Sequence, residues 1–179
     1  MQTITLNDKT FDLYLSEPQL QERIKSLAIE INEVYRETPP LLIGVLKGSF
    51  IFMADLIRHL TVLPEVHFVQ ISTYGDGMIA KKKPQIDPNF NVDIANRHII
   101  IVEDIVDTGY TATFLLNYLK QRSPASVRLM TLLHKPASQV DGKAPDFIGF
   151  SIPPEFVVGY GLDYAQKGRE FRGIYRLKS

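Results

Sequence analysis

The feature that most constrains the fold is the stretch from residue 98 to residue 111, HIIIVEDIVDTGYT. It opens with an unbroken apolar run rich in β-branched residues, which predicts a strand buried on both faces of a parallel sheet. The carboxylates Glu103, Asp104 and Asp107 follow, and beyond Gly109 apolar residues recur at helical spacing. The stretch therefore predicts a strand, an acidic loop and a helix. The free backbone N–H groups at the start of such a helix suit a phosphate.

Carboxylates beside a phosphate site need a further explanation, because they would repel the phosphate. They could accept hydrogen bonds from sugar hydroxyls, hold a cation or take a proton. The plainer interpretation of the same stretch is an N-cap Asp and a solvated acidic loop in an ordinary strand–helix unit. The rest of the chain has to decide between them.

Composition excludes several classes of protein. The 179 residues suit one domain, spanning 1–179, with a sizeable core. Lys plus Arg and Asp plus Glu number 20 each, so the formal net charge is zero, which argues against a dedicated nucleic-acid or membrane-surface protein. The absence of Cys excludes disulfides, thiolate zinc sites and cysteine nucleophiles. No apolar run could span a bilayer, and the first residues lack the basic-then-apolar layout of a signal peptide, so a cytoplasmic protein is expected.

Segments typical of strands and of helices alternate through most of the chain. A hairpin is expected at residues 4–6 and 11–15, and the capping box SEPQ at residues 16–19 predicts a helix to about Arg36. Further strands are expected at residues 41–46, 66–72, 127–133 and 147–150. This alternation implies a parallel sheet covered on both faces, in which ligands bind beyond the carboxyl ends of the strands. The candidate site residues follow such strands: Lys47, residues 103–111, Lys135 and Asp163.

Two loops resemble known phosphate motifs only superficially. Lys47 precedes Gly48, so residues 46–49 do not form a Walker phosphate loop, and an ordinary tight turn is the plain interpretation. Residues 75–80, GDGMIA, fit the dinucleotide fingerprint, but Pro84 and Pro88 would break the helix that this fingerprint must open. The long polar stretch at residues 73–96 is therefore predicted to be a lid or a disordered loop.

Four ordered motifs together resemble one family. The stretch 98–111 resembles the phosphoribosyl-diphosphate signature of the purine phosphoribosyltransferases: four apolar residues, Glu-Asp, two apolar residues, Asp-Thr/Ser-Gly and a final Thr. LKGS at residues 46–49, HKP at 134–136 and FVVGYGLDY at 156–164 are similar to further motifs of this family. Over about residues 41–170 the chain thus resembles the 6-oxopurine (hypoxanthine–guanine) members of the type I phosphoribosyltransferases.

The resemblance implies a fold and an activity. The fold would be a parallel twisted sheet flanked by helices, with a small hood formed by the N- and C-terminal segments. The reaction would move phosphoribose from its 1-diphosphate to hypoxanthine and/or guanine, with Mg²⁺ as cofactor. The expected partners are these small-molecule substrates, without nucleic acid or membrane, in a homodimer or homotetramer. The peptide bond that enters Lys47 would often be cis in this family.

The resemblance also implies residue roles. Asp107 would be the general base that takes the proton from the imidazole ring of the purine. The phosphoribosyl diphosphate would contact Lys47, Gly48, Thr73, Tyr74, Glu103, Asp104, Asp107, Thr108, Gly109, Tyr110, Thr111 and Arg169. The purine would contact Lys135, Phe156, Val157 and Asp163. The metal ligands would be Asp163, Glu103 and Asp104.

Departures from the family and alternative functions remain. Tyr110 stands where some members carry Lys, and the lysines at residues 81–83 depart from a Ser- and Thr-rich lid. A non-purine phosphoribosyltransferase would keep residues 103–111 but would not need Lys135 followed by Phe156. A non-catalytic regulator on the same fold, binding RNA or a nucleotide, is disfavoured by the neutral charge. Taken alone, Lys135 would be a surface lysine at the end of a strand.

Overall fold

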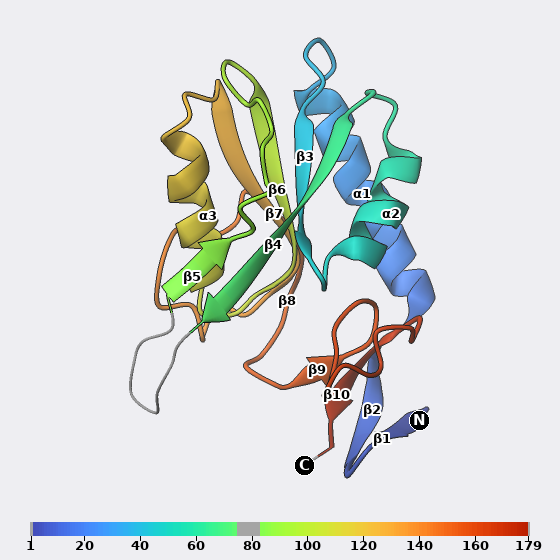
Figure 1. The fold of residues 1–179 in the computed structure, drawn as a ribbon. Coiled ribbons are helices and arrows are strands. Elements are labelled where there is room, and N and C mark those ends of the chain that lie inside the picture. The colour runs from blue at the N-terminus through green and yellow to red at the C-terminus, as the bar shows by residue number, and fades with distance from the viewer. Residues whose placement is uncertain (1, 75–82, 179) are drawn as a thin grey trace.

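The computed structural model describes residues 2–74 and 83–178. Its elements in chain order are β1 (Thr3–Leu6), β2 (Lys9–Leu15), α1 (Glu17–Val34), β3 (Leu41–Leu46), α2 (Phe50–His59), β4 (Glu65–Tyr74), β5 (Lys83–Ile86), β6 (His98–Val106), α3 (Tyr110–Lys120), β7 (Ser126–His134), β8 (Phe147–Ser151), β9 (Val157–Val158) and β10 (Ile174–Leu177). They form a six-stranded sheet in the order β5-β4-β3-β6-β7-β8 and a four-stranded sheet in the order β1-β2-β10-β9 (Figure 1).

The large sheet is mixed. Strands β4, β3, β6, β7 and β8 pair in parallel, which confirms the predicted parallel sheet for this part. Strand β5, which the sequence analysis did not predict, pairs with β4 antiparallel and makes the sheet mixed at this edge. An antiparallel edge strand on an otherwise parallel sheet is common because it needs no crossover helix.

Helices cover both faces of the large sheet, as the alternation predicted. The side chains of successive strand residues point to opposite faces. Leu42, Ile100 and Val102 therefore lie in the core under α1 and α2, whereas Ile43 and Ile101 lie in the core under α3. The continuous apolar runs of β3 and β6 exist because both of their faces are buried. Figure 1 shows α3 on one side of the sheet, with α1 and α2 on the other.

The first helix begins as predicted. The backbone N–H of Ser16 donates to Gln19 Oε1 at 2.9 Å, which is half of the expected capping box. The helix ends at Val34 rather than at Arg36, and the cap residue Tyr35 donates its N–H to Ile31 O. Among the described residues, no helix is both long and apolar enough to cross a membrane.

The stretch at residues 73–96 differs from the sequence-based prediction. Residues 83–86 form β5, and Phe90, Val92 and Ile94 are buried in the core under α3. A free loop over the whole stretch is therefore wrong for residues 83–96, whose alternating apolar side chains pack against the sheet. Pro84 is tolerated because β5 is an edge strand. The rejected fingerprint at residues 75–80 and most of the lysine triplet lie outside the described residues.

The small sheet joins the two ends of the chain. Strand β10 pairs with β2 on one side and with β9 on the other, which confirms that the C-terminal segment packs against the N-terminal hairpin. Phe11, Val158 and Tyr175 form its core. We call this four-stranded sheet the hood. In Figure 1 it lies beyond the lower ends of the large sheet's strands, which are the carboxyl ends of β3, β6 and β7.

Candidate active site

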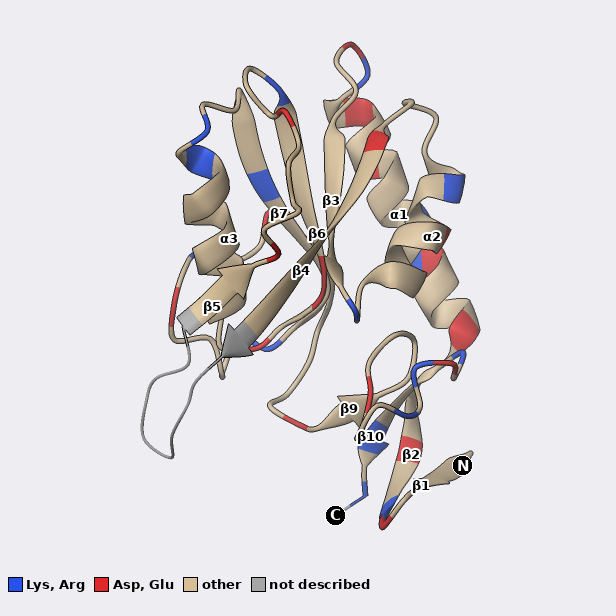
Figure 2. Ribbon diagram, viewed as in Figure 1, with Lys and Arg blue, Asp and Glu red and all other residues tan. Residues whose placement is uncertain are grey.

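The acidic loop after β6 lines a cavity at the carboxyl ends of the strands. Its volume is about 220 Å³, and it is bounded by Glu103, Asp104, Ile105, Val106, Asp107, Thr108, Gly109, Thr111 and Ala112. One continuous strand–loop–helix segment thus provides the whole lining, as the pattern predicted. Figure 2 shows acidic and basic segments gathered where the lower ends of the large sheet approach the hood.

The start of α3 is shaped for an anion. Gly109 caps the helix in the left-handed conformation, with φ of 86°. A Cβ at this position would lie 2.1 Å from Asp141 O, so the turn requires glycine for both conformation and space. Thr113 N–H makes the helix bond to Gly109 O at 2.9 Å. The N–H groups of residues 110–112 precede it at the positions where a helix has no internal acceptor, beside the cavity.

Glu103 and Asp104 differ in their surroundings. Glu103 is buried, and its Oε1 has no hydrogen-bond partner among the described residues. Burial, with a smaller contribution from the Asp104 charge, raises the pKa of Glu103 well above its ordinary value. Burial also raises the pKa of Asp104 to about 6, although the Ile105 N–H and the Arg169 charge oppose the shift. These carboxyl groups are therefore prepared to exchange protons or hydrogen bonds with a polar ligand.

The loop after β3 packs tightly against these acids. We call residues 46–49 the Lys47 loop; its Leu46–Lys47 peptide bond is cis, as the resemblance implied. A Cβ on Gly48 would lie 1.5 Å from Asp104 Oδ2. Gly161, with φ of +100°, approaches so closely that a Cβ there would lie 2.0 Å from Gly48 O. Both glycines are therefore required by the close approach of three loops.

Lys135 follows β7 and points at the acidic loop. Its Nζ donates to Asp107 Oδ2 at 2.7 Å, and its side chain is only 8% exposed. The interpretation of Lys135 as a surface lysine is therefore wrong. Asp107 is 45% exposed, so one end of this ion pair is buried and the other faces solvent. The structure thus joins the predicted general base to the predicted purine contact.

Arg169 and Asp163 lie together in the loop between β9 and β10. We call residues 159–169 the Asp163 loop. Arg169 Nη2 lies 2.6 Å from Asp163 Oδ1, and Arg169 Nη1 donates to Gly161 O at 2.6 Å. Gln166 donates its N–H to Asp163 Oδ2 at 2.7 Å and accepts from Lys47 Nζ at 3.4 Å. Sequence analysis missed Gln166, which belongs to no motif, and only its position beside the Asp163 motif could have pointed to it.

The other described residues predicted to contact a substrate do not line the cavity of residues 103–112. Val157 is buried in β9, and the neighbouring Phe156 is 44% exposed and packs edge-on to Tyr164, with ring centroids 5.9 Å apart. Tyr110 is exposed at the first turn of α3. Thr73 and Tyr74 are the last residues of β4, and their side chains lie outside the described part.

The carboxylates do not form a protein-only metal cage. Among the described residues, no group of three or more His, Asp or Glu side chains converges to hold an ion. Mg²⁺ is usually held by one or two carboxylates together with waters and substrate phosphates, so Glu103, Asp104 and Asp163 still fit that ion. His134 is buried and lies 2.6 Å from Gln139 Oε1.

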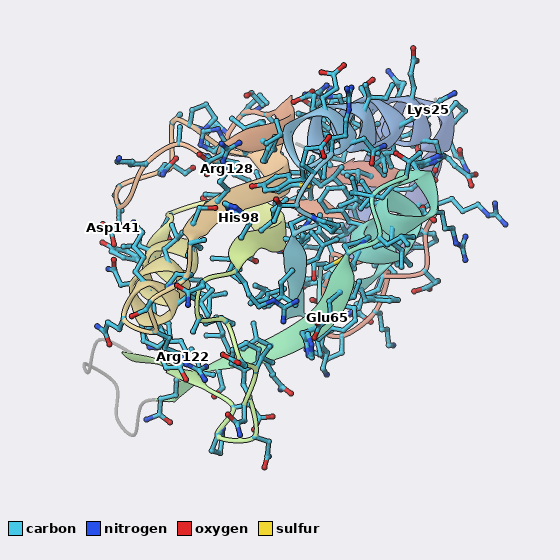
Figure 3. All side chains as sticks on the ribbon, turned by 90° about the horizontal axis from the view of Figure 1, so that it is seen from above. Lys25, Glu65, His98, Arg122, Arg128 and Asp141 are labelled. Atoms are coloured by element: carbon cyan, nitrogen blue, oxygen red, sulfur yellow. The ribbon has the colours of Figure 1, made fainter. Side chains whose placement is uncertain are left out.

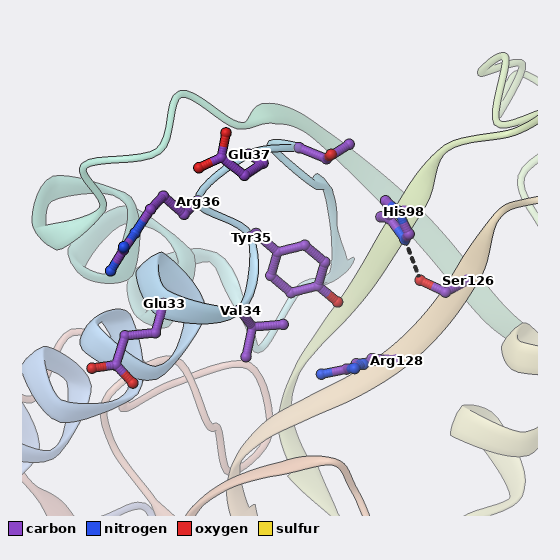
Figure 4. Close-up of a pocket in the computed structure, with 9 residues that line it drawn as sticks. Glu33, Val34, Tyr35, Arg36, Glu37, His98, Ser126 and Arg128 are labelled. Carbon is purple, nitrogen blue, oxygen red and sulfur yellow. Dashed lines mark hydrogen bonds between the residues drawn. The ribbon is translucent and has the colours of Figure 1, made fainter.

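A second cavity lies at the opposite end of the sheet. It has a volume of about 540 Å³ and is lined by Glu33, Val34, Tyr35, Arg36, Glu37, Thr38, His98, Ser126 and Arg128. Figure 3 looks down on this amino end, where His98 and Arg128 come from adjacent strands. Figure 4 shows the Tyr35 ring between the end of α1 and these strands. No residue predicted for the site lies there.

The fold and the carboxyl-end site define a phosphoribosyltransferase, and comparison with known proteins agrees. Residues 11–165 match the model of the phosphoribosyl transferase domain. The chain is 40% identical over 164 residues to hypoxanthine-guanine phosphoribosyltransferase of Bacillus subtilis, covering 92% of this chain and 91% of that protein. It is 42% identical over 170 residues to hypoxanthine phosphoribosyltransferase of Escherichia coli, covering 94% and 96%.

Solved structures give the same result. The crystal structure of a hypoxanthine-guanine phosphoribosyltransferase from Bacillus anthracis matches with a TM-score of 0.87 and 38% identity, over 93% of this chain and 98% of that one. The chain belongs to the phosphoribosyl transferase family. It is a phosphoribosyltransferase of the type I fold, which confirms the resemblance found in the sequence.

Proposed function

We propose that this protein is a purine salvage enzyme. It transfers phosphoribose from 5-phosphoribosyl 1-diphosphate to hypoxanthine and/or guanine and releases diphosphate with IMP or GMP. The observation that carries this proposal is the ion pair between Lys135 and Asp107. A donor for a 6-oxo group and an acceptor for a ring proton stand together at the cavity of residues 103–112. The names of the relatives support the same acceptor bases.

The cavity after β6 binds the phosphoribosyl group in this proposal. The 5′-phosphate lies at the start of α3, where the backbone N–H groups from about Asp107 to Thr111 and the helix dipole favour an anion. Glu103 and Asp104 bind the ribose hydroxyls. Burial raises the pKa of Glu103 above its ordinary value, so a hydrogen bond from a ribose hydroxyl would replace the solvation that this carboxyl group has lost. The raised pKa values also reduce the repulsion between these acids and the phosphate.

The transfer balances without an external reagent. The bond between the anomeric carbon and the diphosphate oxygen breaks, and its electron pair leaves with the diphosphate. The purine ring nitrogen forms the new bond to the anomeric carbon, and its proton passes to Asp107. Lys47, Arg169 and the backbone at Gly48 stabilise the leaving diphosphate. Asp163, with Glu103 or Asp104, would hold Mg²⁺, which would supply further neutralisation of that charge.

The Lys135 ammonium would select 6-oxopurines, because it can donate hydrogen bonds but not accept them. Hypoxanthine and guanine present an oxygen acceptor at position 6, whereas adenine presents an amino group. The backbone carbonyl of Val157 adds to the selection by accepting from the protonated N1 of a 6-oxopurine. Mispaired polar groups in a buried site can discriminate by about 10⁴-fold.

Steady-state kinetics test this proposal. We expect kcat/KM to be high for hypoxanthine or guanine and roughly 10⁴-fold lower for adenine. Lys135→Ala should lower the efficiency for the 6-oxopurines and narrow that gap, whereas Lys25→Ala, an exposed lysine on α1, should change neither. Native activity on adenine equal to that on hypoxanthine would contradict the assignment. Binding of nucleotides without turnover of any base would favour the regulator instead.

An oligomer also belongs to this proposal. We expect a homodimer or homotetramer. The exposed apolar side chains Phe50 and Ile57 on α2 and Phe68 on β4 offer a surface for it. Sedimentation equilibrium at several concentrations would measure the state. A monomer at every concentration would contradict this part without affecting the reaction.

A further inference from the structure

A buried tyrosine connects the Asp163 loop to the two helices α1 and α2 that cover one face of the large sheet. Tyr160 is 3% exposed and has a positive φ of 52°. Its hydroxyl donates to Asp55 Oδ2 on α2 at 2.5 Å. Gln21 Nε2 on α1 donates to the same oxygen at 2.6 Å and lies 3.3 Å from the Tyr160 hydroxyl. Three segments distant in the sequence thus meet at one carboxylate.

We propose that Tyr160 is a positioning residue that fixes the Asp163 loop against the Lys47 loop, so that both can hold the magnesium–diphosphate group. The proposal rests on the proposed function, and it assigns a role to a residue that does not line the cavity of residues 103–112. The cluster of Gln21, Asp55 and Tyr160 has no part in the chemistry described above.

Backbone hydrogen bonds and one ion pair connect Tyr160 to Asp163 in the proposed site. Its N–H donates to Phe171 O at 2.8 Å, and the next N–H, from Gly161, donates to Arg169 O at 2.9 Å. Arg169 in turn pairs with Asp163 at 2.6 Å. A displacement of Tyr160 therefore moves the backbone of Gly161 and the guanidinium that orients Asp163.

The other side of the cluster leads to the Lys47 loop. Helix α2 begins at Phe50, immediately after Ser49, and carries Asp55 one turn and a half further on. Ser49 is buried and its hydroxyl donates to Val45 O at 2.7 Å, so the loop and the helix are held as one piece. Gly161 packs onto Gly48 O. The hydrogen bond from the Tyr160 hydroxyl to Asp55 therefore holds the Asp163 loop against the Lys47 loop.

The chemistry of the cluster makes this bond directional. Burial and then the hydrogen bond to Asp55 raise the pKa of Tyr160, so the hydroxyl keeps its proton and acts as donor. Arg58 lies 3.6 Å from the other oxygen of Asp55 and supports its negative charge. A hydrogen bond from a neutral hydroxyl to a carboxylate is shorter and stronger than one between neutral groups. Losing it should release the loop without emptying the core.

Tyr160→Phe is the test variant, because it keeps the ring and removes only the hydroxyl. Calorimetry measures the affinity for phosphoribosyl diphosphate over a range of Mg²⁺ concentrations, without any base. We expect the affinity to fall about tenfold and the Mg²⁺ requirement to rise, on the scale of a lost charge-assisted bond. In steady state, KM for phosphoribosyl diphosphate should rise by the same order while KM for hypoxanthine stays within about twofold.

Asp55→Asn provides a graded second variant. Its amide oxygen still accepts from Tyr160 but carries no charge, so its effect should lie between native and Tyr160→Phe. Tyr35→Phe is the matched control for the substitution, because it removes a buried tyrosine hydroxyl at the far end of the sheet. It should leave both binding curves unchanged.

The outcomes separate this proposal from a merely structural role. A lower Tm for Tyr160→Phe with unchanged affinity and unchanged Mg²⁺ dependence would overturn it, since a structural cluster changes stability alone. Native protein that binds phosphoribosyl diphosphate but turns over neither hypoxanthine nor guanine would overturn the proposed base specificity, while the binding difference between native and Tyr160→Phe would still support the positioning role.

Discussion

A cavity lies at each end of the large sheet, and the smaller of these two is the proposed site. The carboxyl-end cavity measures about 220 Å³ and the amino-end cavity about 540 Å³. Each end has a buried oxygen without a hydrogen-bond partner among the described residues, Glu103 Oε1 and the Tyr35 hydroxyl. The volume of a cavity therefore does not identify a site, and neither does a single unpaired oxygen.

The difference lies in what surrounds each oxygen. Glu103 is ionisable, stands beside Asp104 and opens onto the start of α3, where a phosphate is favoured. At the other end, His98 Nδ1 is already 2.7 Å from Ser126 Oγ, and the Arg128 guanidinium lies 5.7 Å from the centre of the Tyr35 ring. The helices end rather than begin at the amino end of the sheet, so the partial negative charge of their C-termini disfavours an anion there.

The largest expected effect is the removal of divalent metal. Chelation should abolish activity, because in the proposed function Asp163 and its neighbours would hold the Mg²⁺ that neutralises the leaving diphosphate. Activity measured against free Mg²⁺ should rise from zero and return fully when the ion is restored. Full turnover in excess chelator would show that the carboxylates at this end serve only the sugar.

Asp107→Asn should have the next largest effect. It keeps the shape and the hydrogen bond to Lys135 but loses basicity, so kcat should fall by about 10²–10⁴-fold with little change in Tm. Glu37→Gln, the same type of change at the amino end, should leave kcat at the native value. Near-native kcat for Asp107→Asn would make that residue a structural cap and would remove the contrast between the two ends.

Asp104→Asn should change stability in a pH-dependent way. The pKa of Asp104 is raised by burial from 3.8 to about 6, so the folded state binds this proton more tightly than the unfolded state. The native protein therefore loses stability as pH rises through that window. The Tm of Asp104→Asn should equal that of the native protein near pH 4 and exceed it above pH 6, by a few degrees. A Tm difference that is constant with pH would contradict the shift.

The sequence predicted what depends on local residue types. The β-branched run before Glu103 and the glycine turn at Gly109 determine a strand, a loop and a helix over a few neighbouring residues. The sequence does not predict the edge strand β5, because Pro84 and Pro88 favour a loop. An edge strand tolerates proline, and the alternation of Phe90, Val92 and Ile94 could have indicated packing.

Contacts between residues that are distant in the chain could not be predicted from the sequence. Lys135 and Asp107 are 28 positions apart, and Tyr160 and Asp55 are 105 apart. Periodicity and turn residues say which residues face the core or leave a strand. They contain no information on which side chains meet across two loops, because that depends on packing between elements. The motifs named the candidate site residues, but they did not predict the ion pair between Lys135 and Asp107 or the hydrogen bond from Tyr160 to Asp55.

Tyr35→Phe should have the smallest effect, and it tests the amino end directly. The Tyr35 hydroxyl is buried without a partner among the described residues, and burial raises its pKa, although the Arg128 charge opposes the shift. Phenylalanine removes the desolvated oxygen and keeps the ring on which Arg128 stacks. The free energy of unfolding should therefore rise by about 1 kcal/mol or less, with kcat and both KM values unchanged. Denaturant unfolding and steady-state kinetics check the two parts separately. A change in either KM would mean that the amino-end cavity is coupled to substrate binding at the carboxyl end. A clear loss of stability would mean that the Tyr35 hydroxyl is hydrogen-bonded in solution.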